Sequence, residues 1–307
     1  MFHELIKKLK CLDDIDQIFK SQEDCLEFLE DLMWAGYPES PFDCTSKVYK
    51  CSNHRYKCKN TGKYFTVLTG TIFANTKLPL KTWFKVIFLL ITSRNGISSV
   101  ELTKRVRISQ PSAWFMLQKI RIAMGQENNH KLDGVVEVDE YYAGGIFKNM
   151  HYGKKQEAKA KGKFQNKTPV QGMVERDGNA VAFVVPNFEE KTLNTKVLKY
   201  IKPSAILYSD ENTSYNKLNS YYHHDNVTHS KGNYVNENVH TNTIESVWAT
   251  LTRTINTYIH VSKKYLQYYI NECIFRYNTR RLTIKDAFVW ALKNTSYMHK
   301  QNGYINT

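Results

Sequence analysis

Three carboxylates in the second half of the chain have the residue types and positions that metal-dependent chemistry needs. Asp139 comes late in an apolar stretch at 135–142, Asp210 ends another at 205–210, and Glu245 lies at the start of a helical pattern. Carboxylate oxygens are the ligands that hard divalent cations prefer. A pair of such ions can activate an attacking oxygen and stabilise a leaving one in phosphoryl transfer. The three residues are therefore candidate metal ligands and catalytic residues.

Each of the three also has a purely structural interpretation. Asp139 could cap a turn at the end of its strand, and Asp210 could cap a turn or helix at 211–212. Glu245 follows Asn242 by three positions, which is capping-box spacing. The catalytic interpretation therefore depends on the elements that carry these side chains.

The pattern of residues 134–282 predicts an RNase H-like fold, in which helices cover a mixed sheet. The expected strands are 135–142, 169–175, 180–185, 205–210 and 226–230, and the expected helices are 192–201, 215–222 (or a turn), 243–258 and 263–279. In this topology the first and fourth strands are neighbours. We therefore expect Asp139 and Asp210 to converge at one edge of the sheet.

A small β unit with three short strands is expected at 44–80. Its cysteines follow the spacing C-x₆-C-x₆-C, whereas a zinc ribbon needs paired C-x₂-C knuckles. Thr61 stands where a second knuckle cysteine would follow Cys58. We therefore predict a ribbon-like unit that has lost its metal, with Cys44 and Cys58 as weak zinc candidates and His54 as the other plausible ligand.

Residues 81–126 are expected to be helical, with a short break at 107–109. Ser109 and Pro111 suit the start of the last helix. Helix, short turn and helix is the pattern of a helix-turn-helix, although a plain helical pair in a core would look the same. The candidate DNA contacts on this pair are Gln110, Ser112, Lys119 and Arg121.

The charge of the chain is strongly basic and unevenly placed. The formal net charge is +14, with −7 over residues 1–43 and +21 over the rest. Such a positively charged region attracts polyanions, of which nucleic acid is the commonest. The alternative is that the charge only keeps the protein soluble. The segment 148–167 holds seven lysines, and we expect it to follow DNA phosphates. The candidate contacts there and on the last long helix are Lys154, Lys155, Lys161, Lys163, Arg276 and Arg280.

Membrane and secreted classes are not favoured. The longest apolar run, within 83–92, is far short of the ~20 residues that span a bilayer. The start of the chain lacks a signal-peptide pattern, and six scattered cysteines do not suggest a disulfide framework. We expect a cytoplasmic, nucleoid-associated protein with no membrane partner.

Several motifs together resemble the ISXO-like insertion-sequence transposases of the DDE superfamily, which are related to the Merlin DNA transposons. The motifs are TGTIF at 69–73, VEVDEYYAGG at 136–145, YSDE at 208–211, VTHS at 227–230 with YV at 234–235, VHTNTIESVW at 239–248 and FRYNTR at 275–280. The resemblance spans about residues 21–281.

This resemblance implies a DNA transposase that binds terminal inverted repeats, frees 3′-hydroxyls and joins them to target DNA. Asp139, Asp210 and Glu245 become the ligands of Mg²⁺ or Mn²⁺, with two ions expected. Asn242 is the alternative third ligand, because some members have Asn there. His240 and Arg253 become supporting residues. The family's basic residue about seven positions after the Glu is Thr252 here, beside Arg253.

The expected fold class is α+β or α/β, with an RNase H-like mixed-sheet catalytic domain after a zinc-ribbon-like β hairpin and a helix-turn-helix. The expected regions are an acidic helical leader (1–43), the degenerate ribbon (44–80), the helix-turn-helix (81–126), the DDE domain (134–282) and a C-terminal tail (283–307). The implied partners are DNA and further copies of the chain, in a homodimer or larger complex. The rival functions are a catalytically silent DNA-binding regulator and an RNase H-like structure-selective endonuclease.

Overall fold

The computed structural model divides the chain into two compact units, one formed by residues 1–126 with 281–307 and the other by residues 127–280. It describes residues 2–125, 131–144, 152–153, 155–156, 167–210, 212–226, 240–259 and 261–295. No helix in these ranges is long and apolar enough to cross a membrane.

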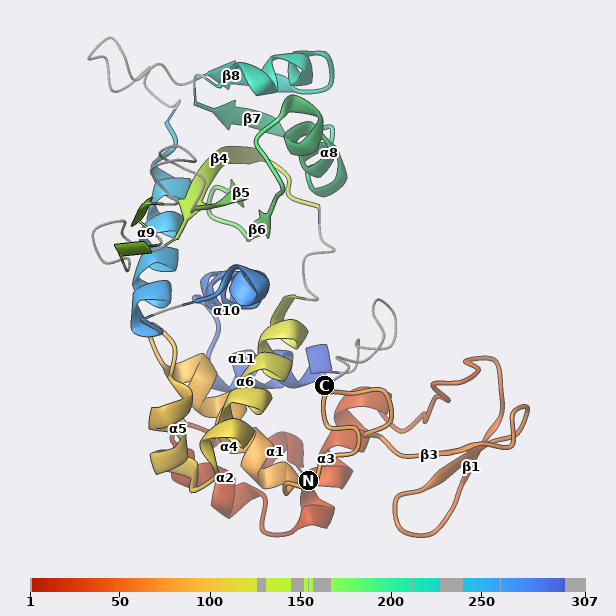
Figure 1. Ribbon diagram of the computed structural model, residues 1–307. Coiled ribbons are helices and arrows are strands. Elements are labelled where there is room, and N and C mark those ends of the chain that lie inside the picture. Colours follow the sequence, from red (N-terminus) through yellow and green to blue (C-terminus); the bar gives the residue numbers. More distant parts are fainter. Residues whose placement is uncertain are drawn as a thin grey trace. The chain divides into compact units, whose positions relative to one another are not determined.

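The second unit is built on a five-stranded mixed sheet (Figure 1). Its strands are β4 (Val135–Ala143), β5 (Thr168–Glu175), β6 (Ala180–Val184), β7 (Ile206–Ser209) and β8 (His223–Asn226). Their order across the sheet is β6-β5-β4-β7-β8, with antiparallel pairing from β4 to β6 and parallel pairing from β4 to β8. This arrangement is compatible with the expected RNase H-like domain. The last strand was expected at 226–230, but β8 ends at Asn226, and residues 227–230 lie outside the described residues.

Helices cover both faces of this sheet because the side chains of its strands alternate between them. On one face, α8 (Glu190–Tyr200) and the 3₁₀ helix η3 (Thr213–Ser220) pack against Val138 and Leu207. On the other face, α9 (Asn242–Thr257) and α10 (Leu266–Asn278) pack against Val170 and Val174. The sheet is therefore the middle layer of this unit.

The edge strand β6 is covered by two side-chain amides of α10. Gln267 accepts a hydrogen bond from the backbone N–H of Val184 at 2.7 Å and donates to the carbonyl of Ala182 at 3.1 Å. Asn278 makes the equivalent pair with Ala180, at 2.8 and 3.1 Å. These bonds satisfy backbone groups that an edge strand would otherwise leave open to another strand.

The first unit has a helical core built around α4 (Leu80–Thr92). The other helices are α1 (Phe2–Ile6), α2 (Leu12–Ile18), α3 (Gln22–Trp34), α5 (Ser99–Val106), α6 (Gln110–Met124) and α11 (Ile284–Asn294). Phe84 of α4 lies among the rings of Phe19, Phe28, Phe73 and Phe288, with centroids 4.9–6.5 Å apart. Since α4 is apolar around most of its circumference, it is buried by helices on several sides.

The expectation of a C-terminal tail from residue 283 is wrong for residues 284–294. This segment forms α11 and belongs to the first unit. Thr283 caps the helix by accepting a hydrogen bond from the backbone N–H of Asp286, and Ala287, Phe288 and Leu292 are buried on one face. That apolar face, rather than proximity in sequence, decides where the segment packs.

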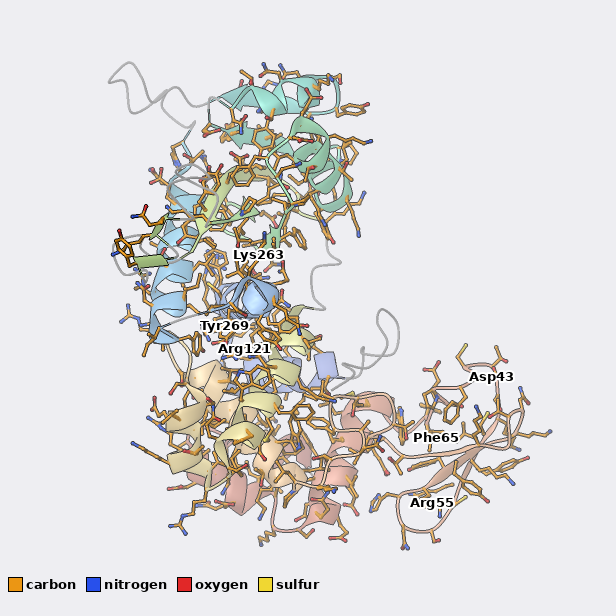
Figure 2. The ribbon with its side chains drawn as sticks, viewed as in Figure 1. Asp43, Arg55, Phe65, Arg121, Lys263 and Tyr269 are labelled. Carbon is orange, nitrogen blue, oxygen red and sulfur yellow. The ribbon has the colours of Figure 1, made fainter. Side chains whose placement is uncertain are left out.

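The small β unit also belongs to the first unit. Its strands β1 (Val48–Lys50), β2 (Tyr56–Cys58) and β3 (Tyr64–Phe65) form an antiparallel sheet. Trp34 of α3 packs edge-on against Tyr56 and Phe65, with ring centroids 4.8 and 6.1 Å away. Phe65 is labelled in Figure 2. These three aromatic rings thus pack one face of the sheet against α3.

Hydrogen bonds link the two loops where a zinc ribbon would have its knuckles. Asn60 donates through its side chain to Asp43 at 2.8 Å and through its backbone to the hydroxyl of Ser46 at 3.0 Å. Burial raises the pKa of the Cys58 thiol, but hydrogen bonds to Ser40, Ser46 and Thr61 outweigh burial and lower this pKa to about 6. Polar side chains therefore surround Cys58.

The zinc candidates do not form a ligand set with a third residue. Cys44 is exposed and Cys58 is buried. His54 donates instead to Glu30, at 3.0 Å. Within the described ranges, no cluster of three or more His, Cys, Asp or Glu ligands contains Cys44 or Cys58.

We predict that Phe288→Ala lowers the free energy of unfolding by about 3–5 kcal/mol, because it empties a fully buried aromatic site between α11 and α4. Ile284→Ala, at a 41 % exposed position of the same helix, is the matched control and should change stability little. Urea unfolding of the whole chain measures both. Equal effects of the two substitutions would contradict the packing of α11.

Candidate active site

The parallel pairing of β4 with β7 forms the centre of the candidate site. Val138 pairs with Ser209, so that the next residue on each strand is a carboxylate, Asp139 or Asp210. The sequence-based expectation that these two strands are neighbours is confirmed. The edge of a parallel pair thus brings together two acids that are distant in sequence.

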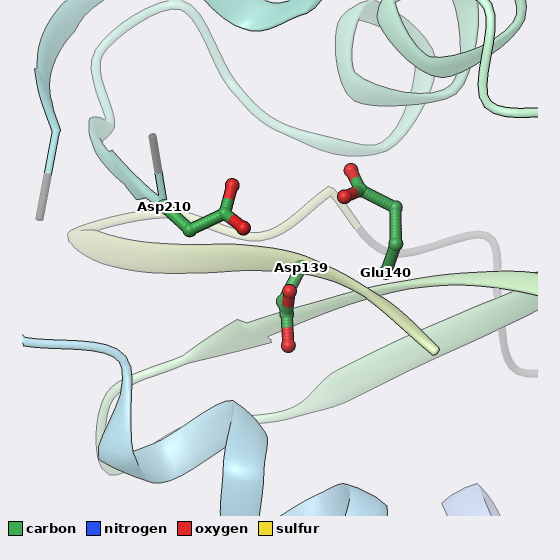
Figure 3. Close-up of side chains that lie close together, drawn as sticks. All are labelled: Asp139, Glu140 and Asp210. Atoms are coloured by element: carbon green, nitrogen blue, oxygen red, sulfur yellow. The ribbon is translucent and has the colours of Figure 1, made fainter. Parts of the chain in front are cut away.

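A third carboxylate, Glu140, belongs to this group, and sequence reasoning missed it. Ligand oxygens of Asp139, Glu140 and Asp210 all lie within 4.8 Å of one another. Figure 3 shows Asp139 and Glu140 leaving β4 on opposite sides, with Asp210 beside the strand. Adjacent strand residues normally face away from each other. The Asp-Glu doublet was the available signal, because both residues directly follow Val138, the last residue of β4 that pairs with β7.

Trp248 of α9 orients Asp139. Its indole Nε1–H donates to Oδ2 of Asp139 at 2.8 Å, and its ring stacks on Tyr141, with centroids 5.2 Å apart. The indole crosses β5 at Gly172, where an added Cβ would lie 2.3 Å from the ring. Trp248 is buried, and it also fixes the carboxylate of Asp139.

Glu140 is held from the opposite face of the sheet. The Tyr215 hydroxyl donates to one carboxylate oxygen, and the Asn212 side-chain amide donates to the other at 3.0 Å. Burial raises the pKa of Glu140 to about 7, and the charges of Asp210 and Asp139 contribute, against the lowering effect of these two hydrogen bonds. Near neutral pH the carboxyl of Glu140 is therefore close to its titration midpoint.

Burial and neighbouring negative charges both disfavour the ionised forms of Asp139 and Glu140. Burial raises the pKa of Asp139, and the negative charges of Asp210 and Glu245 add to the rise, while the Trp248 hydrogen bond lowers it. A divalent cation would remove this repulsion, and oxygen donors are what Mg²⁺ and Mn²⁺ prefer. The donor set and its electrostatics therefore fit such a cation.

Glu245 and Asn242, the two candidates for the third ligand, are both exposed on the first turn of α9. Neither belongs to the group of three acids within 4.8 Å. Glu245 precedes Trp248 by three residues, so both project from one side of the helix. Its charge also acts on Asp139.

The two supporting candidates lie in different surroundings. His240 contacts the Arg176 side chain, whose Nη2 is 3.1 Å from the imidazole Nδ1. Arg253 is exposed and donates to the hydroxyl of Thr250 at 3.0 Å. The hydroxyl of Thr252 is 2.9 Å from that of Tyr141, so the position seven residues after Glu245 faces the sheet.

Two of the residues expected to contact DNA are buried, which corrects the expectation for both. Arg121, labelled in Figure 2, is 1 % exposed, because it shares the inward face of α6 with Leu117 and Met124. The side chain of Arg276 is 9 % exposed and forms an ion pair with the fully buried Glu272. A side chain enclosed in this way has no surface to offer a phosphate.

The other DNA-contact candidates remain predictions. Gln110 is exposed, and Ser112 and Lys119 are partly exposed on α6. Arg280 is exposed and donates to the carbonyl of Gly178 at 3.1 Å. Lys155 is partly exposed, whereas Lys154, Lys161 and Lys163 lie outside the described residues.

Comparison with known proteins finds a transposase domain model and two relatives with transposon- or transposase-related names. Residues 131–278 match the model of the ISXO2-like transposase domain. An uncharacterized protein in transposable element ISH50 of Halobacterium salinarum is 24 % identical over 283 residues, covering 88 % of this chain and 95 % of the relative. An uncharacterized transposase-like protein of Haemophilus influenzae is 30 % identical over 100 residues, covering 32 % of this chain and 80 % of the relative.

A mixed five-stranded sheet, with acids clustered where the pairing of β4 with β7 ends, is compatible with the nuclease-type domain of the DDE transposases. The chain belongs to the insertion-sequence transposases that carry an ISXO2-like domain. The resemblance seen in the sequence motifs is thereby confirmed.

We predict that the metal-free protein loses stability as pH rises from about 4.5 to about 7, partly because of Glu140. Its pKa is raised from 4.5 to about 7 in the folded state, so folding takes up a proton within this window and the stabilisation is lost as pH rises through the folded pKa. Glu140→Gln should make the decrease in the free energy of unfolding with pH shallower. Urea unfolding in a chelating buffer at several pH values measures this free energy.

Glu39→Gln, at an exposed loop position, is the control and should keep the full pH dependence of the wild type. A Glu140→Gln profile that coincides with the wild type would show that Glu140 does not titrate as described.

Proposed function

We propose that this chain is a DNA transposase that binds the terminal inverted repeats of its insertion sequence, cleaves there to free 3′-hydroxyls and joins them to target DNA. Water is the first nucleophile and the freed 3′-hydroxyl is the second. The grouping of Asp139, Glu140 and Asp210 within 4.8 Å carries the proposal, together with the family of the chain. Bringing two element ends together requires at least a dimer in the working complex.

Asp139 and Asp210 would hold Mg²⁺ or Mn²⁺, and we expect two ions. Bound there, the ions would activate the attacking oxygen and stabilise the leaving one. The Trp248 hydrogen bond engages Oδ2 of Asp139. A fixed carboxylate costs less to organise around a cation than one that samples several rotamers.

Glu245 is our preferred third ligand, with Asn242 as the alternative. Glu245 supplies a third negative charge, and its charge already acts on Asp139. Asn242 is the first residue of α9 and is neutral, so it would offer only an amide oxygen. Glu245→Gln and Asn242→Ala separate the two, because only loss of the true ligand should weaken Mn²⁺ binding.

DNA binding is assigned to basic surfaces of the chain, and the outer face of the β1–β3 sheet supports this assignment. Residues 44–65 contain six Lys or Arg and no Asp or Glu. Tyr49 and Tyr64 each pair with Lys57 across the sheet and are 43 % and 51 % exposed. Arg55, labelled in Figure 2, lies over the ring of Tyr64 at 4.7 Å. Cations and exposed aromatic rings without acids suit a nucleic-acid backbone.

We predict that purified protein nicks DNA that carries the element's ends when Mn²⁺ is present, and that Asp139→Asn and Asp210→Asn each reduce the rate at least 100-fold. Both substitutions remove a charged ligand and keep the side-chain size. Asp133→Asn, before the start of β4, is the control and should keep the wild-type rate. Denaturing gels with labelled strands measure cleavage and joining.

The other outcomes identify the rival functions. Binding without any cleavage by the wild type would favour a silent regulator. Cleavage that needs no terminal repeats and gives no joined product would favour a structure-selective endonuclease. Wild-type rates in both Asp variants would refute this active site.

We predict that Lys47→Gln combined with Lys57→Gln weakens binding to end DNA and makes its salt dependence shallower. The slope of log K against log salt should fall by about 0.9 for each phosphate that the variant no longer neutralises. The control pair Lys191→Gln and Lys199→Gln, exposed on α8, should leave the slope unchanged. Fluorescence anisotropy across a salt series measures both, and equal slopes in all three proteins would remove the β1–β3 sheet from the DNA surface.

A further inference from the structure

We infer that Glu137 is a positioning residue for the candidate active site: its buried carboxylate fixes the start of α9 to β4 and so sets where Trp248 and Glu245 lie relative to Asp139. This inference rests on the proposed function. It assigns a role to a residue that touches none of the three clustered acids.

Glu137 caps the N-terminus of α9 from another element. Its side chain is fully buried. The backbone N–H groups of Thr243 and Ile244 donate to Oε2, each at 2.9 Å, and the hydroxyl of Thr243 donates to Oε1 at 2.9 Å. Thr241, at the N-cap position, makes no side-chain capping bond. The first turn of a helix has unpaired N–H groups and a positive dipole end, and Glu137 satisfies both.

Arg176 completes this attachment from the β5–β6 hairpin. Its Nε donates to Oε1 of Glu137 at 2.7 Å, and its Nη2 donates to the carbonyl of His240 at 2.7 Å. The guanidinium also lies over the ring of Tyr208 at 4.8 Å. The buried negative charge of Glu137 is therefore balanced by a cation and a helix terminus, and His240, two residues before the helix begins, is bound to the same arginine.

A second attachment lies farther along the same strand and helix. Asp139 is two residues after Glu137 on β4 and faces the same side, where it accepts the Trp248 indole bond at 2.8 Å. Two strand residues span about 6.6 Å, and the four helical residues from Ile244 to Trp248 span about 6 Å. The two attachments are therefore in register.

The two attachments together fix the orientation of α9 on β4, which a single contact would leave variable. A helix held only through Trp248 could still pivot about that contact, whereas the bonds to Glu137 prevent both rotation and sliding. Glu245 lies between the attachments, next to Ile244. Its exposed side chain thus starts from a fixed backbone position beside Asp139, although Glu245 makes no fixed contact of its own with the group of three acids.

The experiment compares Glu137→Gln with Glu272→Gln. Glu272 is the matched control, because it is also fully buried and ion-paired with an arginine, Arg276, but on α10. Each variant is assayed where unfolding curves show it to be folded. The measurements are Mn²⁺ binding to the protein, the Mn²⁺ concentration for half-maximal cleavage, and amide hydrogen exchange at Thr243 and Ile244.

Glu137→Gln is expected to weaken Mn²⁺ binding and to raise the half-maximal Mn²⁺ concentration, each by at least tenfold, as loss of an outer ligand support does. Exchange at Thr243 and Ile244 should accelerate, while KM for end DNA stays within twofold. Glu137→Asp keeps the charge but shortens the side chain, and it should show the same direction of change. Glu272→Gln should leave the metal response unchanged.

A wild-type metal response in both Glu137 variants, with the wild type active, overturns this inference and leaves the proposed function standing. Equal metal effects of Glu137→Gln and Glu272→Gln also overturn it, because they would show only general loosening. A wild type that neither binds Mn²⁺ nor cuts DNA is failure of the proposed function itself.

Discussion

The parallel pairing of β4 with β7 is the constraint on which the site depends. It sets Asp139 and Asp210 at the same edge, and Val136 and Val138 of β4 share one buried hydrophobic cluster with Leu207 of β7. The acids on β4 are held from both sides: the indole of Trp248 bonds Asp139 from one face, and Tyr215 and Asn212 hold Glu140 from the other. The strand supplies the acids, and the flanking helices decide how they are oriented.

Much of this arrangement follows from the sequence, and the parts that do not have identifiable physical reasons. Alternating apolar runs predict β4 and β7, and their order along the chain predicts that they are neighbours. The role of Glu140 could not be predicted from alternation, because its side chain leaves β4 on the face opposite to Asp139, and Tyr215 and Asn212 hold its carboxylate near the other two acids. The sequence does contain the ion-pair spacing of Arg276, because Glu272 lies one helical turn earlier. This spacing does not predict burial, because ion pairs on exposed helix faces have it too. Whether Glu245 or Asn242 is the third ligand depends on how far each side chain reaches, and the spacing of residues along the chain does not determine this.

The net charge of +14 has a more limited meaning than its size suggests. Arg121 is buried in the first unit, and Arg176 and Arg276 are used to balance Glu137 and Glu272 in the second. The pairs of Arg176 with Glu137 and of Arg276 with Glu272 each carry no net charge, so these two arginines add little to the field outside the protein. Within the described residues, the β1–β3 sheet is a basic stretch without acids, with six Lys or Arg and no Asp or Glu over residues 44–65. Under the proposed function, a local absence of acids of this kind says more about where a polyanion binds than the total charge does.

The packing of α11 against α4 has a consequence for the synthesis of the protein. The first unit is discontinuous in sequence, since its last helix is Ile284–Asn294 and the whole second unit is translated in between. During synthesis, the phenylalanine cluster around α4 cannot be fully packed until Phe288 has left the ribosome. A polypeptide released early leaves this apolar surface open to proteases and chaperones. Quality control would thus remove incomplete chains that already hold both Asp139 and Asp210.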